Sequence, residues 1–153
     1  MEKSCRSDLT AREKIQNAST IAGMAFTTAF LGINHGLAHI LGATFHIPHG
    51  RANAMMFNAV MEYNAERSGR ASCPAAERYA CLAALLQLPA RTSREGTVSF
   101  IDAVARLKRS LGIEDGIGML KISRQDFEAT LDDMAAAALQ DRCTPTNPRK
   151  PAK

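Results

Sequence analysis

Hydrophobic and polar residues follow a helical rhythm along most of this chain. Ala, Leu, Met, Glu and Arg, which favour helices, are frequent, and no stretch alternates apolar with polar residues over a run rich in Val, Ile and Tyr. We therefore predict an all-α, helical bundle-like fold. No internal repeat or low-complexity linker divides the 153 residues, so we predict one domain over 1–153, with an irregular tail at 144–153.

The first predicted helix carries a narrow stripe of small side chains. It begins near Asp8 or Thr10, either of which can cap a helix. The stripe consists of Ala11, Ile15, Ala18, Ala22, Ala25 and Ala29. Because small residues let a neighbouring helix approach closely, we expect this helix to lie in the core of the domain. Gly32 is expected to interrupt it.

The second predicted helix ends at Gly42, because glycine suits a helix C-cap. Its apolar face consists of Ile33, Leu37 and Leu41. The connector that follows, 43–48, ends in a proline, which disfavours helix in the residue before it. We expect the next helix to begin at His49 or Gly50.

Three more helices are predicted in the second half of the chain, separated by connectors at 67–74 and 89–96. Pro74 fits the first turn of one helix, and Ser123 with Asp126 forms a capping-box-like start for the last. Apolar residues recur on these helices at Ala80, Leu82, Leu85, Leu86, Ile101, Val104, Leu107, Leu111, Phe127, Leu131, Met134 and Ala138. The last four of these are expected to be buried.

Composition narrows the class of protein. No apolar run reaches the roughly 18 residues of a membrane span, and the polar N-terminus does not resemble a signal peptide, so we expect a cytoplasmic protein without a membrane partner. The cysteines, Cys5, Cys73, Cys81 and Cys143, contain no C-x-x-C pair and are expected to be reduced thiols. The net charge is +4, but with no Trp and two Tyr we expect no nucleic-acid partner.

All four histidines fall within the segment HGLAHILGATFHIPH. His35 and His39 are four residues apart on a predicted helix and so project from one face, and His49 follows a proline turn. Imidazole is a common ligand for zinc and iron. No acidic residue lies between Lys14 and Glu62, so a carboxylate ligand would have to come from another element. A metal site and a set of hydrogen-bonded structural histidines both remain open.

Gly36 lies between two of these histidines, inside a predicted helix. Glycine there costs about 1 kcal/mol relative to alanine. Its presence indicates the close approach of either a ligand or another helix, and the sequence does not decide between them.

The sequence around these residues resembles a known family. The pattern G-x-x-H-x-x-A-H-x-x-G from Gly32, the P-H-G at 48–50 and the ending DRCTPTNPR are similar to those of iron-containing alcohol dehydrogenases, in the branch of bifunctional aldehyde-alcohol dehydrogenases and microcompartment propanol dehydrogenases. The resemblance implies a two-domain enzyme with its active site in the cleft between domains. This chain then corresponds to the helical C-terminal domain, and the α/β dinucleotide-binding domain is expected to be absent.

The resemblance also implies roles for individual residues. His35 and His49 match two of the four metal ligands, which are one Asp and three His in the family. His39 matches a histidine beside the metal and the nicotinamide, implied in proton relay or substrate orientation. Phe26 matches a position near the nicotinamide ring, and Cys143 one near the substrate pocket, although an ordinary buried thiol is an equally good interpretation of Cys143. His46 matches a variable position.

Two departures from the family pattern limit what we expect of the 153 residues. The remaining Asp and His ligands have no match, since no D-x-x-x-H occurs, and neither G-G-G-S nor G-x-G-x-x-G is present. We therefore expect part of an oxidoreductase that interconverts short primary alcohols and aldehydes, with a divalent metal, iron or zinc, and NAD or NADP in the complete enzyme. The isolated chain is expected to be inactive. The alternatives are a non-catalytic remnant, a module for homo-oligomer assembly, or a simple histidine-cluster metal binder.

Overall fold

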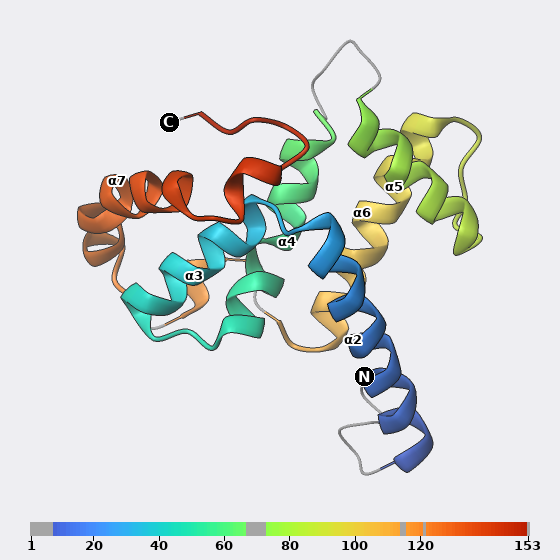
Figure 1. Cartoon of the computed structure of the whole chain (residues 1–153), viewed down its shortest axis with the longest axis horizontal. Coiled ribbons are helices and arrows are strands. Elements are labelled where there is room, and N and C mark those ends of the chain that lie inside the picture. The colour runs from blue at the N-terminus through green and yellow to red at the C-terminus, as the bar shows by residue number, and fades with distance from the viewer. Residues whose placement is uncertain (1–7, 67–72, 114–115, 121, 153) are drawn as a thin grey trace. The chain divides into compact units, whose positions relative to one another are not determined.

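The computed structural model describes residues 8–66, 73–113, 116–120 and 122–152; of Met119 it describes the backbone but not the side chain. Its elements in chain order (Figure 1) are α2 (Leu9–Ala29), α3 (Ile33–Phe45), α4 (His49–Asn64), α5 (Pro74–Leu85), α6 (Ser93–Ser110), the 3-10 turn η1 (Ile117–Met119), α7 (Arg124–Gln140) and the 3-10 turn η2 (Thr144–Thr146). No strand occurs among these residues, which confirms the prediction of an all-α fold. Residues up to Leu31 form one compact unit and those from Gly32 a second; each is described by itself.

The first unit consists of α2, whose start was predicted correctly. The Asp8 carboxylate accepts a hydrogen bond from the Ala11 N–H at 3.0 Å and so caps the helix. No residue of α2 is buried, so its predicted place in the core is wrong. The stripe consists almost entirely of alanine, which buries little apolar area, and the larger side chains Ile21 and Met24 are 66% and 70% exposed.

The second unit begins with α3, which ends later than predicted. The helix passes Gly42 and closes at His46, whose backbone is left-handed with φ 54° and ψ 34°. The predicted C-cap at Gly42 is therefore wrong. This glycine serves a different purpose, because a Cβ there would lie 3.1 Å from the carbonyl oxygen of Ile47, where the chain turns back. As predicted, α4 begins at His49, directly after Pro48.

The starts of α5, α6 and α7 follow from local capping. Cys73 and Pro74 open α5 as predicted, although residues 67–72 of the preceding connector lie outside the described part of the chain. The connector predicted at 89–96 is too long, since Thr92 already caps α6 by accepting the Glu95 N–H at 3.2 Å. Ser123 accepts the Asp126 N–H at 3.0 Å at the start of α7, which confirms the predicted cap.

Two hydrophobic clusters form the core of the second unit. One joins α3, α4 and α7 and contains Ala38, Leu41, Ile47, Ala52, Met55 and Met134. The other joins the end of α4 to α5 and α6 and is built around Met61, Ala65 and Ile101. Met134 and Ala138 are buried as predicted, whereas Leu131 is 47% exposed, contrary to prediction.

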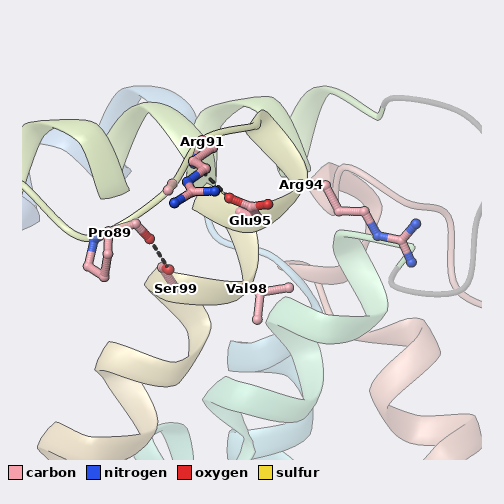
Figure 2. Close-up of a pocket in the computed structure, with 7 residues that line it drawn as sticks. Pro89, Arg91, Arg94, Glu95, Val98 and Ser99 are labelled. Atoms are coloured by element: carbon pink, nitrogen blue, oxygen red, sulfur yellow. Dashed lines mark hydrogen bonds between the residues drawn. The ribbon is translucent and has the colours of Figure 1, made fainter.

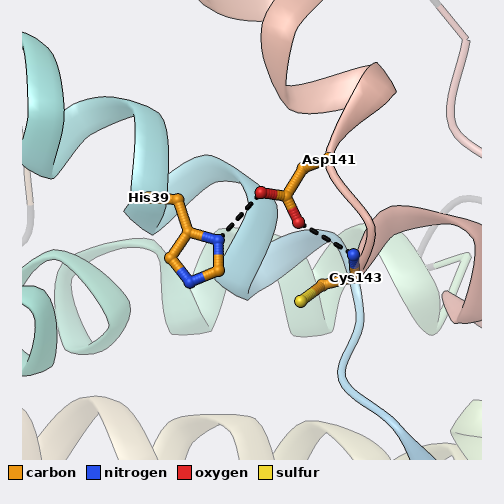
Figure 3. Close-up of side chains that lie close together, drawn as sticks. All are labelled: His39, Asp141 and Cys143. Carbon is orange, nitrogen blue, oxygen red and sulfur yellow. Dashed lines mark hydrogen bonds and ion pairs between the residues drawn. The ribbon is translucent and has the colours of Figure 1, made fainter.

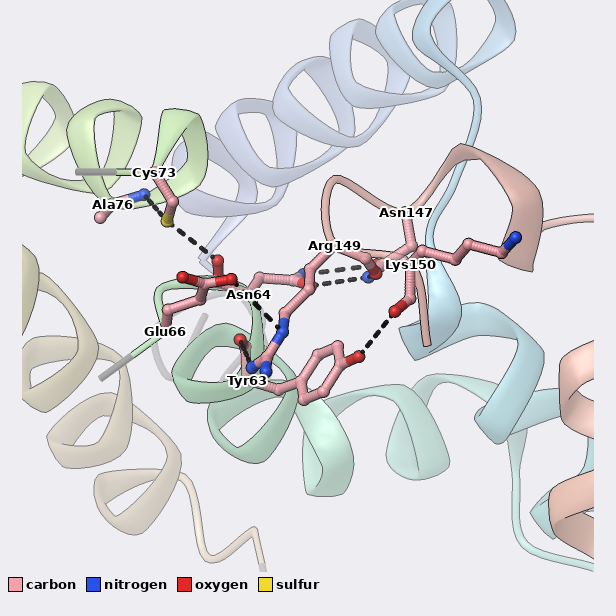
Figure 4. A network of polar contacts seen from close by, with 8 residues as sticks. All are labelled: Tyr63, Asn64, Glu66, Cys73, Ala76, Asn147, Arg149 and Lys150. Carbon is pink, nitrogen blue, oxygen red and sulfur yellow. Dashed lines mark hydrogen bonds and ion pairs between the residues drawn. The ribbon is translucent and has the colours of Figure 1, made fainter. Parts of the chain in front are cut away.

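The C-terminal stretch is more ordered than a free tail. After η2, the Asn147 amide exchanges hydrogen bonds with the Asn64 amide at 2.6 and 3.3 Å (Figure 4). The Arg149 guanidinium donates to the carbonyl oxygen of Tyr63 at 2.9 Å and lies 4.2 Å from the centre of its ring, and the Tyr63 hydroxyl donates to the Lys150 carbonyl oxygen at 3.0 Å. These contacts hold the chain end against the end of α4.

Two further sequence predictions concern cysteines and membranes. Cys73, Cys81 and Cys143 are free thiols, and Cys5 lies outside the described residues. No single helix in the described ranges is long and apolar enough to cross a membrane; only α2 and α3 taken together, across the break between them, reach that length and composition.

Candidate metal centre

Three of the four histidines come together between the first half of α3 and the start of α4. His35 and His39 lie one turn apart on α3, and His49 is the first residue of α4. The ring centres are separated by 6.1 Å between His35 and His39, 5.3 Å between His35 and His49, and 5.2 Å between His39 and His49. His46 ends α3 instead.

The spacing of the three rings is compatible with a divalent cation between them. Nitrogen ligands of a tetrahedral zinc lie about 2.0–2.1 Å from the metal, which places the ring centres about 5 Å apart. The two separations that involve His49 match this spacing, and that between His35 and His39 is wider. The donor set is therefore that of a borderline metal such as zinc or iron rather than of calcium or magnesium.

Hydrogen bonds determine which nitrogen of His49 can bind an ion. Nε2 of His49 lies 3.0 Å from the Asn53 amide nitrogen, which can only donate. The neutral ring therefore carries its proton on Nδ1 and has its lone pair on Nε2. The Asn53 amide is oriented in turn by the Asn34 amide, which donates to Asn53 Oδ1 at 2.8 Å. An ion bound at Nε2 would take the place of the Asn53 N–H.

A carboxylate joins the histidines from the far end of the chain. Asp141 follows directly after α7, and its Oδ2 lies 2.8 Å from Nδ1 of His39 (Figure 3). Its other oxygen accepts the backbone N–H of Cys143 at 2.8 Å. Ligand atoms of His39, Asp141 and Cys143 lie within 4.8 Å of one another. The fold thus brings a carboxylate to the histidines, although the sequence between Lys14 and Glu62 contains none.

Sequence reasoning missed Asp141 because 102 residues separate it from His39. One signal was available. A negative charge at a helix C-terminus opposes the helix dipole, so an Asp directly after α7 indicates a partner elsewhere. The ending DRCTPTNPR contains this residue, but only the fold shows what it contacts.

The environment shifts the pKa values of three groups. Burial lowers the pKa of His35, and the neighbouring His49 and His39 lower it further, against an opposing effect of Asp141. Neutral imidazole, the form that binds metals, is thereby favoured. Burial raises the pKa of Asp141, but hydrogen bonds from the Cys143 N–H and from His39 outweigh it, so that the pKa is lowered overall. Burial and Asp141 raise the pKa of Cys143, which keeps this thiol protonated at neutral pH.

Gly36 allows the end of α7 to approach α3. A Cβ at this position would lie 2.6 Å from Thr144 Oγ1, 3.2 Å from the carbonyl oxygen of Ala138 and 3.3 Å from Cβ of Asp141. Of the two explanations that the sequence left open for this glycine, the structure supports close packing within the chain. The packing places Asp141 within reach of His39.

The remaining predicted site residues have different positions. Cys143 is 8% exposed and lies beside the His39–Asp141 pair, whereas Phe26 lies on α2, in the other unit, and is 46% exposed. The role of Phe26 at a nicotinamide ring and that of Cys143 at a substrate pocket stay predictions.

Other hollows in the described residues offer less chemistry. A hollow of about 400 Å³ at the start of α6 is lined by Pro89, Ala90, Arg91, Arg94, Glu95, Val98 and Ser99 (Figure 2). Two hydrogen bonds at this hollow already hold the start of α6: the Arg91 N–H donates to the Glu95 carboxylate at 2.7 Å, and the Ser99 hydroxyl donates to the Pro89 carbonyl oxygen at 2.5 Å. An apolar cavity of about 230 Å³ between α3 and α7 has no polar lining. The histidine cluster is therefore the best candidate site.

The chain is similar to known proteins in sequence. The model of the Fe-containing alcohol dehydrogenase family, C-terminal, matches residues 2–153. The aldehyde-alcohol dehydrogenase of Streptococcus pneumoniae serotype 2 is 42% identical over 151 residues, which cover 94% of this chain and 17% of that protein. The 1-propanol dehydrogenase PduQ of Salmonella typhimurium is 42% identical over 141 residues, covering 90% of this chain and 36% of that protein.

A solved structure has the same fold. The crystal structure of a 1,3-propanediol oxidoreductase aligns with a TM-score of 0.82 at 34% identity, over 95% of this chain and 36% of that one. The chain therefore spans well under half the length of the relatives it matches.

Proposed function

We propose that this chain, which belongs to the Fe-containing alcohol dehydrogenase family, supplies metal-binding and proton-handling side chains to an oxidoreductase that interconverts primary alcohols and aldehydes with NAD or NADP. The observation that carries the proposal is the group of three imidazoles with ring centres 5.2 to 6.1 Å apart, one of them paired with a carboxylate. The relatives act, by name, on aldehydes, alcohols, 1-propanol and 1,3-propanediol, which favours a short alcohol as substrate.

Each residue in the proposal has a distinct task. His35 and His49 would hold a divalent cation, iron or zinc, through their lone-pair nitrogens. The bound cation supplies Lewis acidity, which lowers the pKa of an alcohol hydroxyl. His39 accepts the proton of that hydroxyl at Nε2, since its Nδ1 is committed to Asp141. Phe26 and Cys143 are assigned to the nicotinamide and the substrate, as the family resemblance implies.

The 153 residues by themselves are proposed to be inactive as a dehydrogenase. The chain contains neither the further Asp and His ligands expected from the resemblance nor a glycine-rich phosphate-binding turn. An assay of the purified 153 residues with Fe(II) or Zn(II), NAD or NADP, and 1-propanol should show no turnover above the metal-only background. Turnover that His35→Ala abolishes would contradict this part of the proposal.

A chimera tests the function directly. The region of the Salmonella typhimurium 1-propanol dehydrogenase that matches this chain is replaced by this chain, and metal content and nicotinamide-dependent oxidation of 1-propanol are measured. The chimera should bind one metal and oxidise the alcohol. His35→Ala and His49→Ala should lose both, whereas His39→Gln should retain the metal and lose about 10²- to 10⁴-fold in rate.

The matched control in the chimera is His46→Asn. His46 lies at the end of α3 and adopts a left-handed backbone that asparagine tolerates. This variant should retain metal and rate. A folded chimera that binds no metal, or equal losses at His46 and His49, would contradict the proposal.

A second candidate is a module for assembly with another copy of the chain. The observation that favours it is an exposed group of leucines on and just after α5, where Leu82, Leu85 and Leu86 are 40%, 78% and 58% exposed. Light scattering of the 153 residues should then show a dimer or larger species that Leu85→Ser dissociates. A monomer at all concentrations would exclude this role.

A further inference from the structure

We infer that Asp141 is a positioning residue for His39: its carboxylate holds the imidazole in the tautomer protonated at Nδ1, so that the lone pair is on Nε2. The use of that lone pair as a proton acceptor rests on the function proposed above. The tautomer itself is a property of this chain and can be measured without metal, cofactor or substrate.

Both oxygens of the Asp141 carboxylate have a defined partner. Oδ1 accepts the backbone N–H of Cys143 at 2.8 Å, and Oδ2 lies 2.8 Å from Nδ1 of His39 (Figure 3). The backbone of Asp141 is held as well, because its N–H donates to the Ala138 carbonyl oxygen at 3.3 Å and its carbonyl oxygen accepts the Thr144 N–H at 3.0 Å. The carboxylate therefore meets His39 from a fixed position.

A fixed carboxylate determines the tautomer of its partner. An ionised carboxylate can only accept hydrogen bonds, so the facing Nδ1 must carry a proton. The Asp141 side chain is 14% exposed, and that of His39 is 40% exposed. Water competes little for the carboxylate oxygen, while the rest of the imidazole ring stays accessible.

Backbone packing alone does not explain why this position is an aspartate. An asparagine could keep its Oδ1 on the Cys143 N–H, and the close approach at Gly36 involves only Cβ of Asp141. Asparagine would place its NH₂ group against Nδ1 of His39, which would then have to accept, and the ring proton would move to Nε2. The carboxylate also opposes the helix dipole at the end of α7. The charge is therefore better explained by His39 than by the fold.

In the proposed reaction this arrangement gives the released proton a defined destination. The alcohol O–H bond breaks and an N–H bond forms at Nε2 of His39, while the hydride from the alcohol carbon reduces NAD or NADP and the aldehyde C=O forms. The ring then carries a positive charge next to Asp141, 2.8 Å away, which stabilises it. Without the carboxylate, an Nε2-protonated ring could not accept the proton at that atom.

The test is a long-range ¹H–¹⁵N NMR measurement of histidine tautomers in the ¹⁵N-histidine-labelled 153-residue chain, at a pH where all imidazoles are neutral. Variants at His35, His46 and His49 assign the His39 signals. Wild-type His39 should be mainly Nδ1-protonated, and Asp141→Asn should make it mainly Nε2-protonated. Asp133→Asn, an exposed acid on α7, is the matched control and should keep the wild-type tautomer.

Two outcomes would overturn the inference: an Nε2-protonated His39 in the wild type, or an Nδ1-protonated ring that persists in Asp141→Asn. If Asp141→Asn impairs folding, as far-UV circular dichroism would show, the wild-type tautomer still decides. In the active chimera, Asp141→Asn should lower kcat at least tenfold, with metal content and KM for the alcohol unchanged. An inactive chimera that has the predicted tautomer would refute the proposed function and leave the positioning role of Asp141 intact.

Discussion

Replacing Gly36 by alanine should destabilise the second unit, although alanine is the better helix former. The new Cβ would lie 2.6 Å from Thr144 Oγ1 and 3.2 Å from the Ala138 carbonyl oxygen. The Thr144 hydroxyl could move away, but it is buried and donates to that same carbonyl oxygen at 2.5 Å. Neither neighbour can therefore retreat without losing a contact.

The expected magnitude follows from three contributions. Overpacking a well-packed site costs about 1–3 kcal/mol. Loss of the Thr144 hydrogen bond adds about 0.5–1.5 kcal/mol to this destabilisation. The higher helix propensity of alanine offsets about 1 kcal/mol of it. The Gly36→Ala variant should therefore lose about 0.5–3.5 kcal/mol in free energy of unfolding.

Urea unfolding followed by tyrosine fluorescence measures this loss. The chain has no Trp, and its two tyrosines, Tyr63 and Tyr79, both lie in the second unit, so the signal reports on that unit alone. Gly50→Ala is the matched control, since it adds the same methyl group to a helix with nothing within 4 Å. It should be neutral or slightly stabilising.

A double-mutant cycle identifies the contact responsible. In a Thr144→Ala background the nearest atom to the new methyl group is gone, so Gly36→Ala should cost about 1 kcal/mol less than it does in the wild type. Equal midpoints for Gly36→Ala and Gly50→Ala, or additive effects in the cycle, would refute the close approach of α7 and η2 to α3. The placement of Asp141 beside His39 would then lose its structural basis.

Three further predictions concern the rest of the second unit. Asn147→Ala should cost about 2–4 kcal/mol and make the C-terminus sensitive to protease, because it leaves the buried Asn64 amide without its partner; unchanged cleavage would contradict this. Lys108→Ala should cost about 2–3 kcal/mol in urea unfolding, since the buried ammonium donates to a backbone carbonyl of α4 at 3.2 Å; a neutral effect would argue against that contact. Burial raises the pKa of Tyr79 above the ordinary 10.0. In the Tyr63→Phe variant, where Tyr79 is the only tyrosine, tyrosinate absorbance should therefore appear above pH 10.0, and the free energy of unfolding should fall as pH rises through that range. A titration midpoint at or below pH 10.0 would refute the burial of Tyr79.

Features set by neighbouring residues could be predicted from the sequence. The caps at Asp8 and Ser123 were predicted because each helix start is decided within about four residues. The His35–His39–His49 group was predicted because His35 and His39 lie one helical turn apart on α3 and His49 opens the next helix along the chain. Local chemistry was sufficient in these cases.

Features that depend on distant parts of the chain were missed for physical reasons. Gly42 has the residue type of a C-cap, but it lies inside the helix, where the return of the chain at Ile47 brings a carbonyl oxygen within 3.1 Å of the position of a Cβ. Asp141 has no special local pattern, and its role depends on the way α7 ends against Gly36. A glycine in a helix is ambiguous until its neighbour is known.

The C-terminal stretch, predicted as an irregular tail, connects the two helices that carry the histidines. Asn147 Oδ1 accepts the N–H of Ile33, the first residue of α3, at 3.2 Å, and thereby provides the side-chain cap that Gly32 lacks. The same side chain pairs with Asn64, the last residue of α4. Asp141 lies just before Asn147 in the sequence and faces His39. One short segment therefore both joins the two helices and positions the carboxylate. The geometry of the histidine cluster therefore depends on residues that contain no metal-binding pattern of their own.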